Sequence, residues 1–185
     1  FLKNNTVYPS YSAQNCIQGT IDVGFKLNAK GEVYYATLTR GIGTDLDDEA
    51  LRLIKLSSGK WKVSLNHDTL ALILIPMRFT LKGYGCENRD KNSIAMAIRA
   101  YKAEKELTNV ILNFYRGKEK GKYNAEDEPK ILKLKVELDD YLQGKINAGL
   151  KKIKQGDKQG ACDDFNFVKY MGSDKADALL SKYCN

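Results

Sequence analysis

The stretch QGTIDVGFKLNAKGEVYYATLTR, residues 18–40, decides the fold of the first half of the chain. Its first part alternates apolar and polar side chains, which is the period of a half-buried strand. The apolar positions are Ile21, Val23, Phe25 and Leu27. Residues 28–31 then supply a turn, in which Gly31 can adopt a positive φ. Because a second alternating run over 33–39 follows the turn, the stretch predicts a β-hairpin.

Three more elements complete this half of the chain. Pro9 opens a short helix over 9–15, and acidic residues after Thr44 mark the first turn of a helix over 45–56. A third strand is predicted over 69–81. One of its faces carries Leu72, Leu74, Arg78 and Thr80. We expect the other face to be buried together with the helix, and the expected core residues are Ile73, Ile75, Met77, Phe79, Leu81, Leu53, Ile54 and Trp61.

The order of these elements predicts the topology of the sheet. A helix between the second and third strands makes a crossover, so the third strand should run parallel to the second. It can then pair with the free side of the first strand, in the spatial order 2-1-3. The first half is therefore predicted to be an α+β fold, a three-stranded antiparallel sheet with helices on one face.

The four cysteines form two candidate pairs. Their number alone leaves two disulfides or four buried thiols equally open. The predicted topology brings Cys86, after the third strand, close to Cys16, before the first. Cys162 and Cys184 lie at the start of one helix and the end of the next, in a predicted antiparallel pair. We therefore predict disulfides Cys16–Cys86 and Cys162–Cys184 and an oxidising compartment.

The second half is predicted to be entirely helical. Apolar residues recur at helical spacing over 90–116, and a charged connector follows over 116–129. Another helix is marked by Ile131, Leu134, Leu138, Tyr141 and Leu142, and three short helices are expected over 146–184. Small Gly149 and Ala161 lie where such helices would pack closely. We place the domains at 1–86 and 87–185, the second being an all-α helical-hairpin region.

Composition excludes several classes of protein. The 185 residues are 43% hydrophobic, and their net charge of +7 is spread along the chain without a basic cluster. Nucleic acid is therefore not an expected partner. The longest apolar run, residues 70–77, is too short to span a membrane. Because the sequence opens on Phe1, we expect any membrane anchor or signal peptide to lie upstream, and membrane contact only through such an anchor.

Residues that could support catalysis are few. His67, the single histidine, lies beside Asp68 in a predicted surface turn and cannot complete a zinc site with the dispersed cysteines. The Gly-rich stretch 41–45 could hold an anion at the following helix, but we interpret it as a linker. Adjacent acids at 139–140 and 163–164 are expected on exposed helix faces. We therefore expect no enzymatic activity, no metal and no cofactor.

An ordered series of residues in the first half resembles the TonB carboxy-terminal domain family over about residues 8–82. The series is Tyr8-Pro9, Gly19, Val23, Phe25, Gly31, Arg40-Gly41-Ile42-Gly43, Leu46-Asp47, Ala50, Trp61 and Pro76-Met77-Arg78-Phe79. One departure is that Val63-Ser64 replaces the proline usual after the tryptophan. The tail resembles a tetratricopeptide-like helical hairpin, and the two parts together look like envelope proteins of the Bacteroidetes group.

The resemblance to the TonB family implies a function. It implies a non-enzymatic periplasmic adaptor, similar to a TonB energy transducer, whose exposed strand pairs with a short extended segment of an outer-membrane transporter. In this chain the third strand would be the free edge, and the predicted partner-binding residues are Leu70, Leu72, Leu74, Arg78 and Thr80. Two alternatives remain open. The C-terminal helices could cover this edge, or the protein could be a soluble envelope scaffold that binds partners through its helical tail, without energy transduction.

Overall fold

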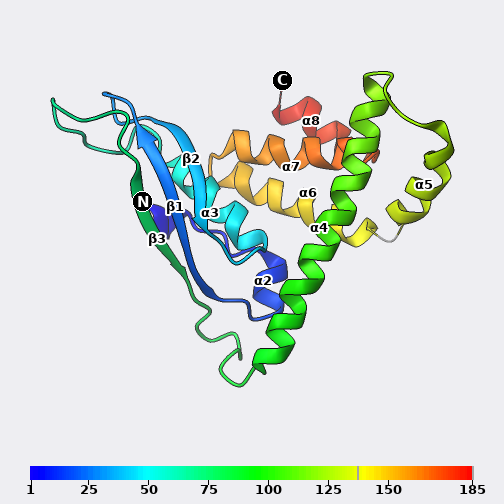
Figure 1. Ribbon diagram of the computed structural model, residues 1–185, viewed down its shortest axis with the longest axis horizontal. Helices are drawn as coiled ribbons and strands as arrows, with labels where there is room; N and C mark the ends of the chain where they lie inside the picture. Colours follow the sequence, from blue (N-terminus) through cyan, green and yellow to red (C-terminus); the bar gives the residue numbers. More distant parts are fainter. Residues whose placement is uncertain (137, 185) are drawn as a thin grey trace. The chain divides into compact units, whose positions relative to one another are not determined.

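The computed structural model describes residues 1–136 and 138–184 and divides into two compact units, Phe1–Lys102 and Ala103–Asn185 (Figure 1). The first unit contains α1 (Leu2–Asn5), α2 (Ser10–Gln14), β1 (Gly19–Leu27), β2 (Val33–Arg40), α3 (Asp45–Leu56) and β3 (Ile73–Phe79). Helix α4 (Lys91–Glu119) begins in the first unit and ends in the second. The domain boundary at residue 86 stays a prediction.

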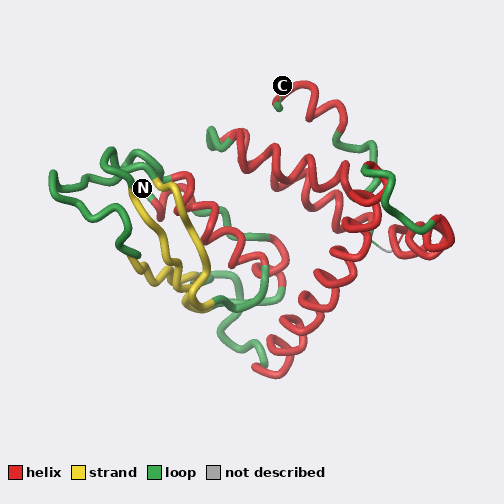
Figure 2. Tube along the Cα trace, turned by 45° about the horizontal axis from the view of Figure 1, so that its top comes forward, coloured by secondary structure: helices red, strands yellow, loops and turns green. Residues whose placement is uncertain are grey.

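The sheet has the predicted topology. Its strands lie in the order β2-β1-β3, and β1 is antiparallel to both neighbours. Figure 2 shows the strands of this sheet side by side in yellow. Gly19 pairs with Phe79 at one end of the β1–β3 ladder, and Phe25 pairs with Ile73 at the other. Strand β3 is shorter than the predicted 69–81, because residues 69–72 form a turn and a loop before it. The α+β fold predicted from the sequence is confirmed.

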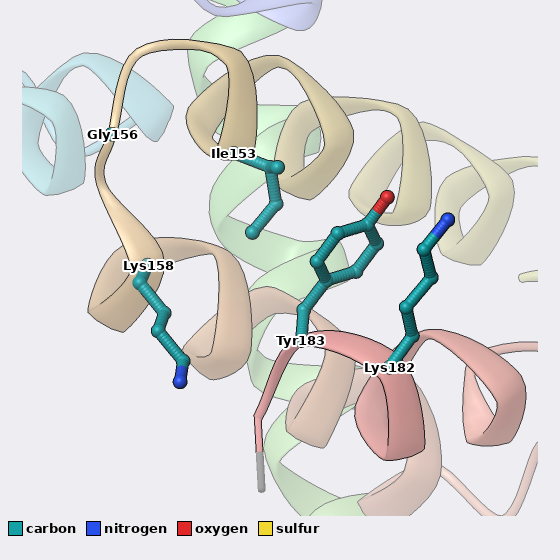
Figure 3. A pocket seen from close by; sticks show the side chains of 5 residues that line it. All are labelled: Ile153, Gly156, Lys158, Lys182 and Tyr183. Atoms are coloured by element: carbon teal, nitrogen blue, oxygen red, sulfur yellow. The ribbon is translucent and has the colours of Figure 1, made fainter.

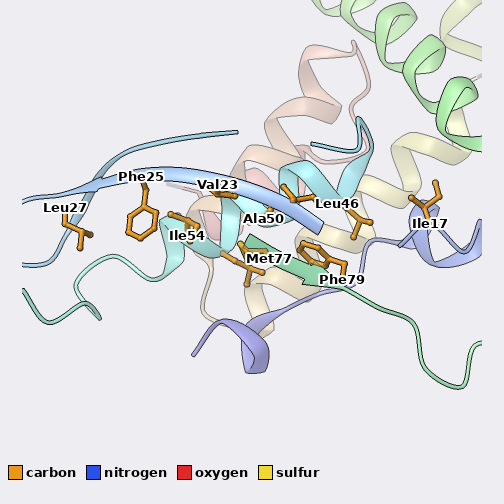
Figure 4. Close-up of a cluster of buried hydrophobic side chains, with 11 residues drawn as sticks. Ile17, Val23, Phe25, Leu27, Leu46, Ala50, Ile54, Met77 and Phe79 are labelled. Carbon is orange, nitrogen blue, oxygen red and sulfur yellow. The ribbon is translucent and has the colours of Figure 1, made fainter. Parts of the chain in front are cut away.

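Helix α3 covers one face of the sheet and forms the core with it (Figure 4). The apolar side of α3 is fully buried against the alternating residues of β1, and Met77 and Phe79 of β3 complete the cluster. The fully buried residues of these two elements are Leu46, Ala50, Leu53 and Ile54 of α3, and Ile21, Val23 and Phe25 of β1. The period-2 pattern therefore identified the inner face of β1 correctly.

Three expected core residues are only half-buried, so their predicted burial was wrong. Ile73 and Ile75 contact the core cluster but lie on an edge strand, and no further strand lies beyond it in the part of the chain that the structure describes. Trp61 follows α3 and packs against the ring of Phe25, with 4.9 Å between the ring centroids. Its indole N–H donates to the Ser57 hydroxyl at 2.8 Å, so the ring lies along the border of the core.

The hairpin turn requires glycine at residue 31. Gly31 has a φ of 75°, and a Cβ atom there would lie 2.1 Å from the backbone oxygen of Trp61. Any other residue would have to displace the segment after α3. The turn thus fixes both the hairpin and the position of Trp61.

A buried ion pair attaches the N-terminal segment to α3. The Arg52 Nε and Glu49 Oε2 atoms are 2.7 Å apart, and both side chains are nearly inaccessible to solvent. The backbone N–H of Val7 donates to Glu49 Oε1, and Arg52 Nη2 donates to the Asn5 carbonyl, each at 2.7 Å. Because buried charges are tolerated when they are paired and hydrogen-bonded, this pair holds residues 5–7 in place.

The second unit is helical. After the end of α4 it contains the 3-10 helix η1 (Ala125–Asp127), α5 (Glu128–Val136), α6 (Asp139–Lys154), α7 (Lys158–Tyr170) and α8 (Asp177–Tyr183). Helices α6 and α7 pack closely, since a Cβ atom at Gly149 would lie 2.5 Å from the Phe165 ring. Between them the Lys152 ammonium lies 2.6 Å from the carboxylate of Asp164. The prediction that Asp164 lies on an exposed helix face was wrong, because its side chain is buried.

The single helix predicted from the apolar residues over 131–142 was wrong. Helix α5 ends at Val136, and α6 begins at Asp139 with Leu138 as its N-cap. Asp139 and Asp140 occupy the first turn of α6, where the helix dipole favours acidic side chains. The connector predicted over 116–129 is also shorter, because α4 continues to Glu119.

Both predicted disulfides are confirmed. Cys16 and Cys86 are bonded across 5.4 Å between their Cα atoms, and Cys162 and Cys184 across 5.7 Å. The first bond joins the segment before β1 to the loop after β3. The second attaches the end of α8 to α7.

Removing the Cys16–Cys86 disulfide should destabilise the protein more than removing the other. The two bonds close loops of 70 and 22 residues, for which chain entropy gives about 4 and about 3 kcal/mol. Urea unfolding of the Cys16→Ser/Cys86→Ser and Cys162→Ser/Cys184→Ser variants measures both losses. A larger loss in the second variant would contradict this order.

Unfolding above pH 10 should depend on Tyr8. Its hydroxyl donates to the Ile17 carbonyl at 2.6 Å, and burial, assisted by the Asp45 carboxylate, raises the pKa of Tyr8 to about 12. In the unfolded chain this pKa is about 10. The stabilisation is therefore complete below pH 10 and is lost as the pH rises towards 12. Tyr8→Phe should show a flatter loss of stability over this interval in denaturant titrations, and parallel curves would refute the assignment.

Candidate functional site

Strand β3 lies at an edge of the sheet. Its ladder with β1 occupies one side, and no other strand in residues 1–136 and 138–184 pairs with its second side. We call this second side the free edge, and we call the sheet face turned away from α3 the outer face. A free edge presents unpaired backbone N–H and C=O groups, which can accept another strand.

The five predicted partner-binding residues all have exposed side chains. Leu74 and Arg78 are in β3, Leu70 and Leu72 are in the loop before it, and Thr80 follows it. Leu70 is 74% exposed, Leu72 46% and Leu74 60%, so three large apolar side chains are exposed within one short segment. The structure therefore brings these residues together along one strand and its flanks, while their binding role stays a prediction.

Two contacts fix the loop before β3 against the outer face. Leu72 lies over Gly24 of β1, where a Cβ atom would come within 3.2 Å of its Cδ1 atom. The hydroxyl of Tyr34 in β2 donates to the Thr69 carbonyl. Glycine at residue 24 therefore makes room for an apolar side chain on the outer face. The sequence pattern alone did not predict this contact, because Gly24 occupied a polar position of the alternation.

The direction of the β3 backbone groups follows from two contacts of neighbouring residues. The carbonyl of Asp22 accepts from the hydroxyl of Thr39 in β2, at 3.0 Å, so the backbone of Asp22 faces β2. Its partner across the β1–β3 ladder is Pro76. In an antiparallel ladder a residue bonds to its opposite partner through both backbone groups or through neither. Asp22 and Pro76 are therefore a non-hydrogen-bonded pair, and the backbone of Pro76 faces the free edge.

The second contact agrees with this assignment. The backbone N–H of Leu81 donates to the side chain of Gln18, at 2.6 Å, on the β1 side. Odd-numbered residues of β3 thus direct their backbone groups to β1, whereas even-numbered residues direct theirs to the free edge. Leu74 and Arg78 consequently present both a main-chain donor and an exposed side chain. Pro76 was the sequence signal for this arrangement. Because proline has no N–H to donate to β1, residue 76 and the other even-numbered residues of β3 are expected to face away from the β1 ladder.

The Gly-rich stretch before α3 is already occupied by a side chain. The backbone N–H groups of Ile42 and Gly43 donate to the carboxylate of Asp47, at 2.8 and 2.7 Å. Asp47 is buried. An internal carboxylate therefore satisfies the amides that could have held an external anion, in agreement with our interpretation of residues 41–45 as a linker.

Hollows are found among the described residues of the helical unit, and two of them stand out. One, of about 310 Å³, is lined by Ile153, Gly156, Lys158, Lys182 and Tyr183, with the Lys182 ammonium 5.0 Å from the centre of the Tyr183 ring (Figure 3). The other, of about 480 Å³, lies among α4, η1 and α5 and is mostly apolar. Its lining residues include Val110, Phe114, Tyr123, Ile131 and Leu134. Our reading of the sequence did not predict either hollow.

The titratable groups form no metal-binding cluster in the part of the chain that the structure describes. No three His, Cys, Asp or Glu side chains gather there in a way that could hold an ion. His67 is half-buried after a turn, and its backbone N–H donates to the Ser64 carbonyl. All four cysteines are in disulfides.

Residues 4–81 match the family model described as the Gram-negative bacterial TonB protein C-terminal. The match covers all three strands and α3. It ends before α4, so the tetratricopeptide-like character of the helical tail stays a prediction. No curated protein and no solved structure matches the chain.

Across residues 1–136 and 138–184, none of the helices combines the length and the apolar character that crossing a bilayer requires.

The direction of the backbone groups predicts opposite results for two neighbouring prolines. Leu74→Pro removes an N–H that faces the free edge and should leave the β1–β3 ladder intact. Ile75→Pro removes an N–H that faces Val23 of β1, which costs about 1 kcal/mol for the hydrogen bond alone and more where the ring clashes with β1. Urea unfolding should show near wild-type stability for Leu74→Pro and a clear loss for Ile75→Pro. Equal losses would show that the assignment is wrong.

Proposed function

We propose that this protein is a periplasmic adaptor for outer-membrane transporters, because residues 4–81 match the family model of the TonB protein C-terminal. The family indicates a role in protein interaction in the cell envelope. The proposal is that β3 pairs with an extended segment of a transporter and holds it as a fourth strand of the sheet. The protein would act by binding and would catalyse no reaction.

The observation that carries the proposal is the free edge of β3. Its unpaired main-chain groups adjoin the exposed side chains of Leu72 and Leu74. Main-chain hydrogen bonds would supply most of the affinity, and the neighbouring side chains would supply selectivity. The opposite side of the strand is paired with β1 along its whole length, so the strand is already extended before a partner binds, and less ordering entropy is lost on binding.

Two further features support a location in the periplasm. Both cysteine pairs are disulfides, and such bonds persist in oxidising compartments. The family model that residues 4–81 match describes the C-terminal part of the Gram-negative bacterial TonB protein, which implies a periplasmic location. The proposed partner is accordingly an outer-membrane transporter with a segment that extends into the periplasm.

A second candidate function is that of an envelope scaffold which binds partners through the helical unit. The apolar hollow among α4, η1 and α5 favours it, because Val110 is 53% exposed and Tyr123 is 43% exposed at its rim. A groove of this kind binds through side-chain contacts rather than through main-chain pairing. The two functions therefore differ in the residues on which binding depends.

Binding to transporter segments should be lost in the folded Leu74→Pro variant and kept in Leu74→Ala. The proline removes a free-edge donor and places its ring against the partner strand, which should weaken binding about tenfold or more. Alanine keeps the N–H and loses only side-chain contact. Titration calorimetry with synthetic peptides from the periplasmic segments of the organism's outer-membrane transporters measures both affinities.

A matched variant in the helical unit separates the two functions. Val110→Glu places a charge in the apolar hollow and leaves every residue of the sheet unchanged. Under the adaptor proposal its peptide affinity equals that of the wild type. Unchanged binding by folded Leu74→Pro, together with lost binding by Val110→Glu, would refute edge pairing and favour the scaffold.

A further inference from the structure

We infer that Pro76 divides the free edge into two short pairing sites and so determines which strands can dock there. This inference rests on the proposed function, since it concerns how the partner segment pairs with β3. It assigns a role to Pro76 beyond its place in the strand. The occupant is a single extended peptide segment rather than the long edge of another sheet.

The inference starts from the direction of the backbone groups of β3. Leu74, Pro76 and Arg78 face the free edge, as the contacts of Asp22 and Leu81 show. Each would form one paired position with an incoming strand. Proline has no N–H, so the middle position can accept a hydrogen bond but cannot donate one. Donors remain only at Leu74 and Arg78, roughly 13 Å apart at the rise of a β-strand.

The missing donor leaves one carbonyl of the partner strand without a bond. Pro76 is exposed, so this carbonyl can turn to water, provided that the partner backbone is free to bend at that residue. A flexible segment can make this adjustment. A strand already held in a sheet cannot bend without disturbing its own ladder, and proline on an edge is a known obstacle to such sheet-to-sheet pairing.

The side chains on the two sides of Pro76 also differ. On the N-terminal side Leu72 and Leu74 expose apolar surface, and on the C-terminal side Arg78 and Thr80 expose polar groups. A partner segment therefore meets an apolar contact at one donor and a polar contact at the other. Because the proline lies between them, the two contacts can form without a continuous ladder.

Restoring the missing donor tests the inference. Pro76→Ala supplies an N–H at the middle position, and one additional hydrogen bond should tighten peptide binding about two- to tenfold. The probes are nine-residue synthetic peptides from the periplasmic segments of the organism's outer-membrane transporters, titrated against the full chain. The matched control is Pro129→Ala, an exposed proline at the start of α5, which should leave the affinity unchanged.

Hydrogen exchange followed by NMR provides the second measurement. In the free protein the amides of Leu74 and Arg78 should exchange fast, whereas those of Ile75 and Met77 should be protected by β1. On peptide binding to Pro76→Ala, the new amide of residue 76 should become protected together with those of Leu74 and Arg78.

The possible outcomes separate the inference from the proposed function. If Leu74→Pro abolishes binding but Pro76→Ala binds no tighter than the wild type, the division by Pro76 is wrong and edge pairing stands. A protected Leu74 amide in the free protein would also overturn the inference. If no peptide binds to either the wild type or Pro76→Ala, the proposed function fails, and this inference fails with it.

Discussion

The antiparallel pairing of β1 with β3 is the contact on which the rest of the first unit depends. It places β3 beside β1, so that the side chains of both strands pack against α3 in one core. It also brings Cys16 and Cys86 to the same end, where the disulfide can form. Since β1 is bonded on both sides, β2 and β3 remain as edges. The same pairing thus creates the core and the candidate binding edge.

The ladder also determines which groups of β3 are available to a partner. Odd-numbered residues direct their side chains towards α3 and their backbone groups to β1, as the burial of Met77 and Phe79 illustrates. Even-numbered residues direct both side chains and backbone groups away from the domain. Alternate residues of β3 therefore have different roles: the odd-numbered ones stabilise the domain, and the even-numbered ones are available for the binding that we propose. For this reason substitutions at Leu74 and Ile75 should act on different properties of the protein.

Chain order and hydrophobic period predicted most of this unit from the sequence. The strand order followed from the crossover through α3, and the Cys16–Cys86 bond followed from that order. The hydrophobic pattern could not predict that Ile73, Ile75 and Trp61 are only half-buried. Such a pattern identifies the buried face of an element but not how far a residue lies from the edge of the sheet. The sequence analysis did not predict the break between α5 and α6, because apolar residues continue at helical spacing past Leu138. The acids at 139–140 were the available signal.

The sequence predicted which strand forms the candidate site, but not which of its main-chain N–H groups face a partner. The five predicted side chains are exposed, yet the binding chemistry that we propose resides in the main chain, which composition and motifs do not describe. Pro76 is the exception, because a residue without an N–H must turn its nitrogen away from a ladder. A proline in an otherwise regular strand therefore indicates which side of that strand is free. An edge interrupted in this way favours a short and reversible contact, since fewer hydrogen bonds must break when the partner leaves. Such a contact suits the adaptor function that we propose, because a partner segment held in this way can also be released.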